Sequence, residues 1–222
     1  MEDRAGQAQE IGGGVHLRRV GGQDLKIAAA AEPKDRVARA GARVSAAGPG
    51  AGTRNAILGL GVRSYLEVLA PDPAQVNAPA DFLSLSGPVL HTFAIATDRL
   101  DRMAAKLEQA GLPQAGLIPM SRRLPSGRLV RWRLLIPTGH PYGPLVPFFI
   151  DWGDSPHPAD GAEGGCSLSR LSLTHPEAWS LRPLLQRLDV DVEVDAGPPA
   201  ITAELTTPKG LVRLSSRDQV PG

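Results

Sequence analysis

The sequence predicts an α+β protein built from two βαβββ modules in tandem, followed by a third, module-like unit. One order of elements, a strand, a helix and then further strands, can be traced twice between residues 15 and 160. The two copies share a local register, since His16 and His91 stand equally far before Leu25 and Leu100, where each helix is expected. The same order can be traced once more after residue 160.

The first module is expected at 15–73, after a Gly- and Gln-rich tail at 1–14 that has no usable period. The pattern predicts a strand at 16–20 and then an Ala-rich helix at 23–42, which Pro33 would interrupt or kink. Strands at 53–60 and 64–70 follow a Gly-rich turn. The departures from the second copy make this module atypical.

The second module is expected at 89–160, after a Pro- and Ala-rich linker at 74–88. Its predicted elements are a strand at 90–97, a helix at 98–110 ended by Gly111, and strands at 117–123, 128–137 and 146–152. Alternation of apolar and polar residues supports the strands.

The third unit is expected at 161–222, as an extension that covers an exposed sheet face or edge. Its predicted elements are a strand at 167–174, a helix at 177–188, and strands at 190–194, 200–206 and 211–215. The helix is predicted to bury one apolar face despite Pro183; the residues of that face are Trp179, Leu181, Leu184, Leu185 and Leu188.

Charge and apolar runs restrict the partners and the location. The formal net charge of +1 gives no field that would gather nucleic acid or an anionic membrane. No signal peptide or membrane-spanning run is recognised, and Cys166 is the only cysteine, so a cytoplasmic location is expected. The expected partner is a small molecule, with the chain either a monomer or a homodimer.

Several segments resemble the glyoxalase-like domain family of the vicinal oxygen chelate superfamily, which also contains bleomycin-resistance proteins and dioxygenases. The segments are Gly52-Thr53-Arg54-Asn55, Tyr65-Leu66-Glu67-Val68-Leu69-Ala70-Pro71-Asp72-Pro73, Ser121-Arg122-Arg123, Arg131-Trp132-Arg133 and Phe149-Ile150-Asp151-Trp152-Gly153. The resemblance implies that the tandem modules form a cupped mixed sheet. It leaves the activity open, because superfamily members include isomerases, dioxygenases, transferases and non-catalytic binding proteins.

The resemblance also implies a metal site inside the cup, with ligands from the first and last strands of each module. The matching residues are His16, Glu67, His91 and Asp151. Such a set suits one divalent ion, Zn²⁺, Mn²⁺, Fe²⁺ or Ni²⁺, and Glu67 would also be the catalytic base. Thr92 competes with His91 for its position, because a shift of one residue reverses the face of a strand. The alternative is that Glu67 and Asp151 pair with arginines.

A second group of residues is predicted to bind the substrate. Arginine forks hold carboxylate or phosphate groups, and indole rings provide flat apolar walls. The residues concerned are Asn55, Arg122, Arg131, Trp132 and Trp152. Only one face of the strand that holds Arg131 and Trp132 can line a pocket. The alternative is that the arginines are solvated or paired and the tryptophans are part of the core.

These residues lead to two hypotheses for function. The first is a metal-dependent lyase, isomerase or dioxygenase that acts on a small oxygen-rich molecule. The second is a metal-free binding or sequestration module that uses the same cup. Catalysis predicts that the four candidate ligands converge, whereas sequestration predicts an apolar cup walled by Trp132 or Trp152 with those ligands apart. A third option is that the atypical first module leaves the protein inactive, since Gly48 stands where relatives have a second His.

Overall fold

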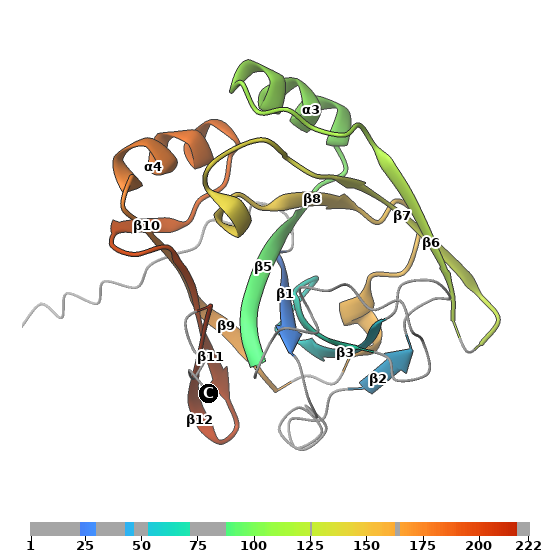
Figure 1. Cartoon of the computed structure of the whole chain (residues 1–222). Helices are drawn as coiled ribbons and strands as arrows, with labels where there is room; N and C mark the ends of the chain where they lie inside the picture. Colours follow the sequence, from blue (N-terminus) through green and yellow to red (C-terminus); the bar gives the residue numbers. More distant parts are fainter. Residues whose placement is uncertain are drawn as a thin grey trace, which may run out of the picture.

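The computed structural model describes residues 23–29, 43–46, 53–71, 88–124, 126–162 and 165–216. Within these ranges the chain forms an eight-stranded sheet, a four-stranded sheet and two α-helices (Figure 1). The predicted strand at 16–20, the Gly-rich turn before β3 and most of the linker lie outside the described residues. Among the described residues, no helix has the length and apolar character needed to cross a membrane.

The eight-stranded sheet contains the strands of both modules, in the order β2-β3-β4-β1-β5-β8-β7-β6. In each module the first strand pairs in parallel with the last one, β1 with β4 and β5 with β8. The antiparallel pair β1 and β5 joins the two halves. The strands are β1 (Gln23–Ala29), β2 (Arg43–Ala46), β3 (Thr53–Gly59), β4 (Tyr65–Pro71), β5 (Pro88–Ala96), β6 (Ile118–Arg123), β7 (Leu129–Leu135) and β8 (Phe148–Asp151).

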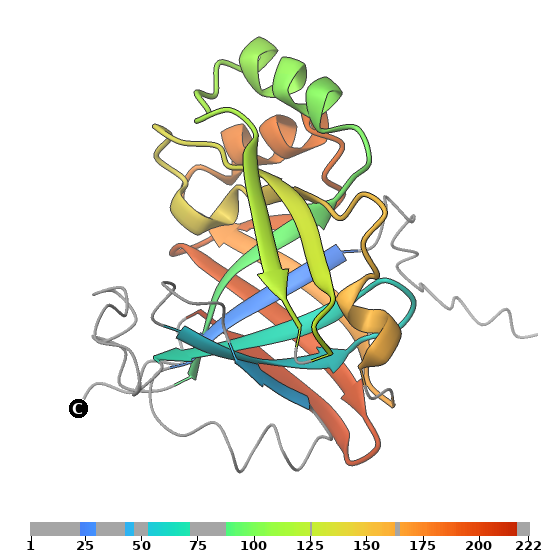
Figure 2. The ribbon, with the colours of Figure 1, turned by 90° about the vertical axis from the view of Figure 1, so that its right-hand side faces the viewer.

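Both halves therefore have the same strand order, related across the central pair β1 and β5, and the sheet curls around one side (Figures 1 and 2). The tandem arrangement and the curved mixed sheet that the sequence predicts are confirmed. The pairs β3–β4 and β6–β7 match the predicted antiparallel strands closely.

The prediction of a helix over 23–42 is wrong at its beginning, where the chain forms β1. Alanine is the best helix former, but propensity is a weak influence that tertiary context often overrides. Here the segment is hydrogen-bonded on both sides, to β4 and to β5, so its backbone groups are satisfied as a central strand. No element was predicted between that helix and the Gly-rich turn, where the chain forms the strand β2.

Helix α3 (Leu100–Gln109) packs on the outer, convex side of the sheet through Leu100, Met103 and Leu107. Their spacing places them on one face of the helix, as the apolar pattern predicts. Complete burial of a leucine contributes about 1.5–3 kcal/mol. The helix ends as predicted near Gly111, whose φ of 71° is in the left-handed region that favours glycine.

The third unit has the predicted element order but not the strand order of the modules. It consists of β9 (Ser167–His175), α4 (Ala178–Arg187), β10 (Glu193–Ala196), β11 (Ala200–Thr207) and β12 (Gly210–Ser215). Its sheet has the order β10-β9-β11-β12, so its first strand lies inside the sheet rather than beside the last strand. Strands β11 and β12 contact β5, and one core cluster includes residues of both sheets and both helices. The unit thus covers the outer face of the larger sheet, as expected.

Helix α4 buries Leu181, Leu184 and Leu185, with Leu188 directly after it, as predicted. Trp179, however, is 77% exposed, so its predicted place in the core is wrong. It stands two residues before Leu181, roughly 200° around the helix at 3.6 residues per turn, and therefore faces away from the sheet.

Candidate functional site

The inner face of the larger sheet, which we define as the face that carries Tyr65 and Glu67, is the concave side away from the third unit. Glu67 is in register with Lys26, which is in register with Thr92. Alternation along β5 and pairing with β8 then place Ala94, Phe148 and Ile150 on this face. Pairing through β7 and β6 adds Leu134, Trp132, Met120 and Arg122.

Aromatic rings form a continuous row across the inner face. The ring centroids of Trp132 and Trp152 are 5.3 Å apart, with an interplanar angle of 38°. Trp152 contacts His157 edge-on at 5.9 Å, and His157 contacts Tyr65 edge-on at 5.5 Å. These separations are within the range of favourable aromatic pairs. The row joins the second module to β4 of the first.

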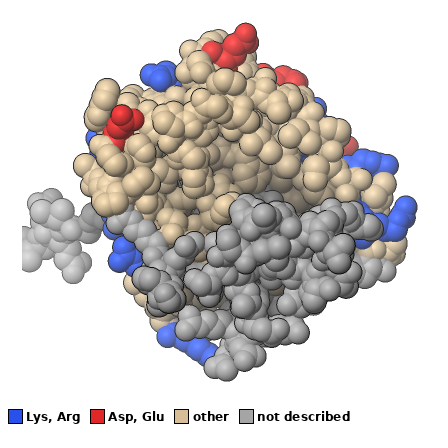
Figure 3. All heavy atoms as spheres, viewed as in Figure 1, with Lys and Arg blue, Asp and Glu red and all other residues tan. Residues whose placement is uncertain are grey.

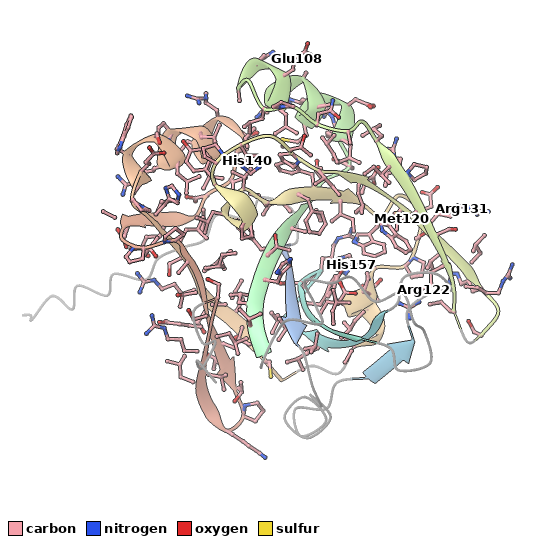
Figure 4. All side chains as sticks on the ribbon, in the orientation of Figure 1. Glu108, Met120, Arg122, Arg131, His140 and His157 are labelled. Carbon is pink, nitrogen blue, oxygen red and sulfur yellow. The ribbon has the colours of Figure 1, made fainter. Side chains whose placement is uncertain are left out.

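His157 lies on the inner side because the chain after β8 folds back over the sheet (Figure 4). It precedes the short 3₁₀-helix η2 (Pro158–Gly161), and its Nδ1 accepts a hydrogen bond from the N–H of Ala159 at 3.2 Å. The N–H of His157 donates to the carboxylate of Asp160 at 3.1 Å. This reciprocal capping fixes the ring, which is only 3% exposed, between Tyr65 and Trp152.

Two charged groups share the inner face with the aromatic row. Glu67 is 8% exposed, and Arg122 is half-buried on β6 (Figure 4). Burial lowers the pKa of the Arg122 guanidinium, and the charge of Glu67 partly offsets that effect. The two groups are therefore close enough to interact electrostatically. A half-buried guanidinium still carries its charge at neutral pH.

The position predicted for a ligand in β5 is taken by Thr92. His91 is exposed. The register between β1 and β5 shifts just beyond Thr92, which marks a β-bulge next to His91. Pairing through Lys26 thus brings Thr92, rather than His91, into register with Glu67.

Asp151 also lies on the opposite face from Glu67, in register with Arg133. Its carboxylate accepts hydrogen bonds from Arg133 at 2.5 Å and from the N–H of Gly153 at 2.8 Å. Burial raises the pKa of Asp151, but these hydrogen bonds and the charge of Arg133 outweigh it, and the pKa lies below its ordinary value. Asp151 thus forms an ion pair with an arginine, which is the predicted alternative to metal binding.

The four predicted metal ligands are therefore not brought together as far as the described residues show. Glu67 is on the inner face and Asp151 is on the opposite face. In β5, Thr92 rather than His91 is in register with Glu67, and His16 is outside the described residues. Within the described part of the chain, no group of three or more His, Cys, Asp or Glu side chains has the geometry to hold a metal ion.

The predicted substrate-binding residues divide between the two faces. Arg122, Trp132 and Trp152 belong to the inner face, whereas Arg131 is exposed on the outer side of β7 (Figure 4). The Ser155 hydroxyl accepts a hydrogen bond from the N–H of Arg131 at 2.9 Å and donates one to its carbonyl at 2.7 Å. These bonds satisfy the backbone groups of Arg131, which lies beyond the part of β7 that pairs with β8. For Asn55 the structure gives only a place on β3, in register with Leu69.

The sequence matches the model of a family described as the glyoxalase-like domain over residues 26–188. The chain belongs to the glyoxalase-like domain family. It is thus a member of the vicinal oxygen chelate superfamily. No curated protein sequence matches this glyoxalase-like chain.

A solved structure has the same fold as this glyoxalase-like domain, and two others show a weaker similarity. A hypothetical protein from Staphylococcus aureus has 15% sequence identity and a TM-score of 0.57, over 87% of this chain and 85% of that one. A Mn(II)-bound glyoxalase from Novosphingobium aromaticivorans has 13% identity and a TM-score of 0.45, over 88% and 82%. A methylmalonyl-CoA epimerase from Mycobacterium tuberculosis has 21% identity and a TM-score of 0.40, over 66% and 98%.

Three inner-face residues of this glyoxalase-like domain were not among the predicted site residues: Tyr65, Met120 and His157. Alternation would have found Tyr65, two residues before Glu67, and Met120, two residues before Arg122. His157 belongs to a loop, and no periodic pattern indicates that this loop folds back onto the sheet.

Proposed function

We propose that the inner face binds a small molecule that has a flat apolar body and an anionic, oxygen-rich group. The observation that carries this proposal is the aromatic row beside a half-buried arginine. Trp132 and Trp152 supply a flat apolar wall, and Arg122 is on the neighbouring strand β6 of the same face. Pockets of this kind, apolar with a few placed polar groups, are typical of small-molecule sites.

Arg122 and Glu67 would set the specificity of this site. The guanidinium can give two parallel hydrogen bonds to a carboxylate, and partial burial reduces competition from water. Glu67 disfavours a second negative charge near it and favours a hydroxyl or amide that donates a hydrogen bond. A ligand with one anionic group and one donor therefore fits the pair better than a dianion.

A suitable test ligand for this proposal is 4-hydroxybenzoate, which has a flat ring, one carboxylate and one hydroxyl donor. Quenching of tryptophan fluorescence gives the dissociation constant for the wild-type chain. Exchange Arg122→Gln removes a charge-assisted hydrogen bond worth about 1.5–3 kcal/mol, so we expect at least tenfold weaker binding.

The matched control is Arg123→Gln, on the same strand but on the outer face, which we expect to leave binding unchanged. Saturable binding that does not differ between the two variants would reject Arg122 as the anion-binding residue. If 4-hydroxybenzoate and related aryl carboxylates all fail to bind the wild-type chain, the binding proposal is wrong.

The second candidate is a metal-dependent lyase, isomerase or dioxygenase in which Glu67 is both ligand and proton-transfer base. The buried carboxylate of Glu67, on the last strand of the first module, favours it. At least one further ligand would have to come from outside the described residues, with His16 the sequence-predicted one. Lewis-acid stabilisation of an enolate is the chemistry that such an ion would supply.

Elemental analysis of the dialysed protein separates the two candidates. Near-stoichiometric metal in the wild-type chain, absent from Glu67→Ala, would support the metalloenzyme and justify assays with small carbonyl compounds. For the binding module we expect no stoichiometric metal in either protein, and unchanged 4-hydroxybenzoate binding after treatment with a chelator.

A further inference from the structure

A second cleft lies at the margin of the inner face, where the two modules and the third unit meet. It has a volume of about 680 Å³ and opens at the carboxyl ends of the parallel strands β5 and β8. One wall is a face of α3, and the end of α4 closes the opposite side. Its size is within the range of ligand pockets, about 300–1,000 Å³.

The floor of this cleft is apolar and well packed. Ile150, Met103 and Leu188 line it and are each at most 9% exposed. Trp152, a member of the aromatic row, also lines the cleft, so the cleft adjoins the inner face at this residue. The floor thus offers contact for the apolar body of a ligand.

The rim of the cleft carries three exposed arginines from two separate segments. Arg99 and Arg102 are one turn apart at the start of α3, and Arg63 comes from the turn between β3 and β4. No ion pair recorded among the described residues involves any of the three. Three guanidinium groups around one opening can donate more hydrogen bonds than a carboxylate accepts, which favours a phosphate.

The acidic residues of the cleft do not cancel this charge. Asp151 is paired with Arg133, and Asp189 is paired with Lys106 across the gap between α3 and the end of α4. Asp98 and Asp154 remain on the rim, against three arginines. With Arg133 counted as the partner of Asp151, five cationic groups stand against four carboxylates, which leaves an excess of one positive charge at the opening.

We propose that this cleft binds a phosphate monoester with an apolar body, with Arg63, Arg99 and Arg102 around the phosphate and the body on the floor formed by Met103 and Ile150. The first turn of α3 adds to the attraction. Its N-terminus has no side-chain cap, and free amides at a helix start attract anions. The site needs no residue outside the described ranges.

The experiment is calorimetric titration of the full chain with phenyl phosphate, and with inorganic phosphate as the probe that lacks an apolar body. We expect saturable binding of phenyl phosphate and weaker binding of inorganic phosphate. The double variant Arg99→Gln/Arg102→Gln should bind phenyl phosphate at least tenfold more weakly. Absence of phenyl phosphate binding to the wild-type chain overturns the proposal.

Two controls separate this site from other sources of binding. Arg187→Gln/Arg213→Gln removes the same charge from exposed positions that do not line the cleft, and we expect it to bind like the wild type. An equal loss of phenyl phosphate affinity in this control would show that the effect comes from the net charge of the chain, and it would overturn the proposal. The variant Arg122→Gln tests the inner face. If it alone abolishes binding, phenyl phosphate binds in the cup and the cleft is not its site.

Discussion

Exchange of Asp151 for asparagine tests whether this carboxylate stabilises the fold through Arg133 or holds a metal. Asparagine keeps the shape and can still accept the hydrogen bond from the N–H of Gly153, so the change removes mainly the charged interaction with Arg133. Hydrogen bonds to charged groups contribute about 1.5–3 kcal/mol. The Arg133 side chain is 46% exposed, so solvent screening reduces this to about 1 kcal/mol.

For a chain of 222 residues, 1 kcal/mol corresponds to a Tm decrease of about 2–4 °C. Asp151→Ala should cost roughly 1 kcal/mol more, since the amide of Gly153 then also loses its hydrogen-bond acceptor. Urea unfolding followed by circular dichroism at pH 7 gives both values. Asp154→Asn, three residues later and exposed, is the matched control and should change stability little.

The pH dependence gives the same test a second readout. The pKa of Asp151 is lowered in the folded protein, so its stabilising contribution is present above the unfolded pKa, about 3.9, and is lost as the pH falls through the folded value. The difference between wild type and Asp151→Asn should therefore shrink in acid. Equal stability at pH 7, together with loss of a bound metal in the variant, would refute the structural role and restore Asp151 as a ligand.

Three further expectations follow from burial. Leu107→Ala, at a fully buried site in α3, should lower the free energy of unfolding by about 2–5 kcal/mol, measured in urea. Trp179→Ala, at a 77% exposed site, should change it by no more than about 0.5 kcal/mol in the same assay, and a larger loss would show that the ring packs against something. Burial lowers the pKa of His140, so its neutral form favours folding; the wild type should lose stability as the pH falls below about 6.5, and His140→Phe should lose less over that interval in thermal melts.

Much of the fold was predictable because strand alternation and helix periodicity are local signals. The run from Tyr65 to Leu69 is short, mostly apolar and bounded by Gly61 and Pro71, as is typical of a buried strand. The apolar spacing of Leu100, Met103 and Leu107 indicates the helix that forms. Residues 23–29 misled the prediction because their Ala-rich local preference conflicts with pairing on two sides, which only the complete sheet reveals. The strand order of the third unit is likewise a property of tertiary pairing.

The candidate site was predictable only in part, for a related reason. Glu67, Arg122, Trp132 and Trp152 share the inner face as expected, because each is on a strand whose parity is clear. The choice between His91 and Thr92 depended on one residue of register next to a β-bulge, which the sequence does not mark. Asp151 lies on the same face of the sheet as Arg133, and this is known only from the pairing of β7 with β8.

The position of β1 has a consequence for dissecting this protein into fragments. Since β1 is hydrogen-bonded to β4 on one side and to β5 on the other, it is the strand through which the two halves of the larger sheet are hydrogen-bonded to each other. A fragment that starts at residue 50 would keep Glu67, Arg122 and both inner-face tryptophans, yet leave two long strand edges without their shared neighbour. Such a fragment should aggregate rather than fold, so the smallest independently folding piece of this chain must begin before Gln23.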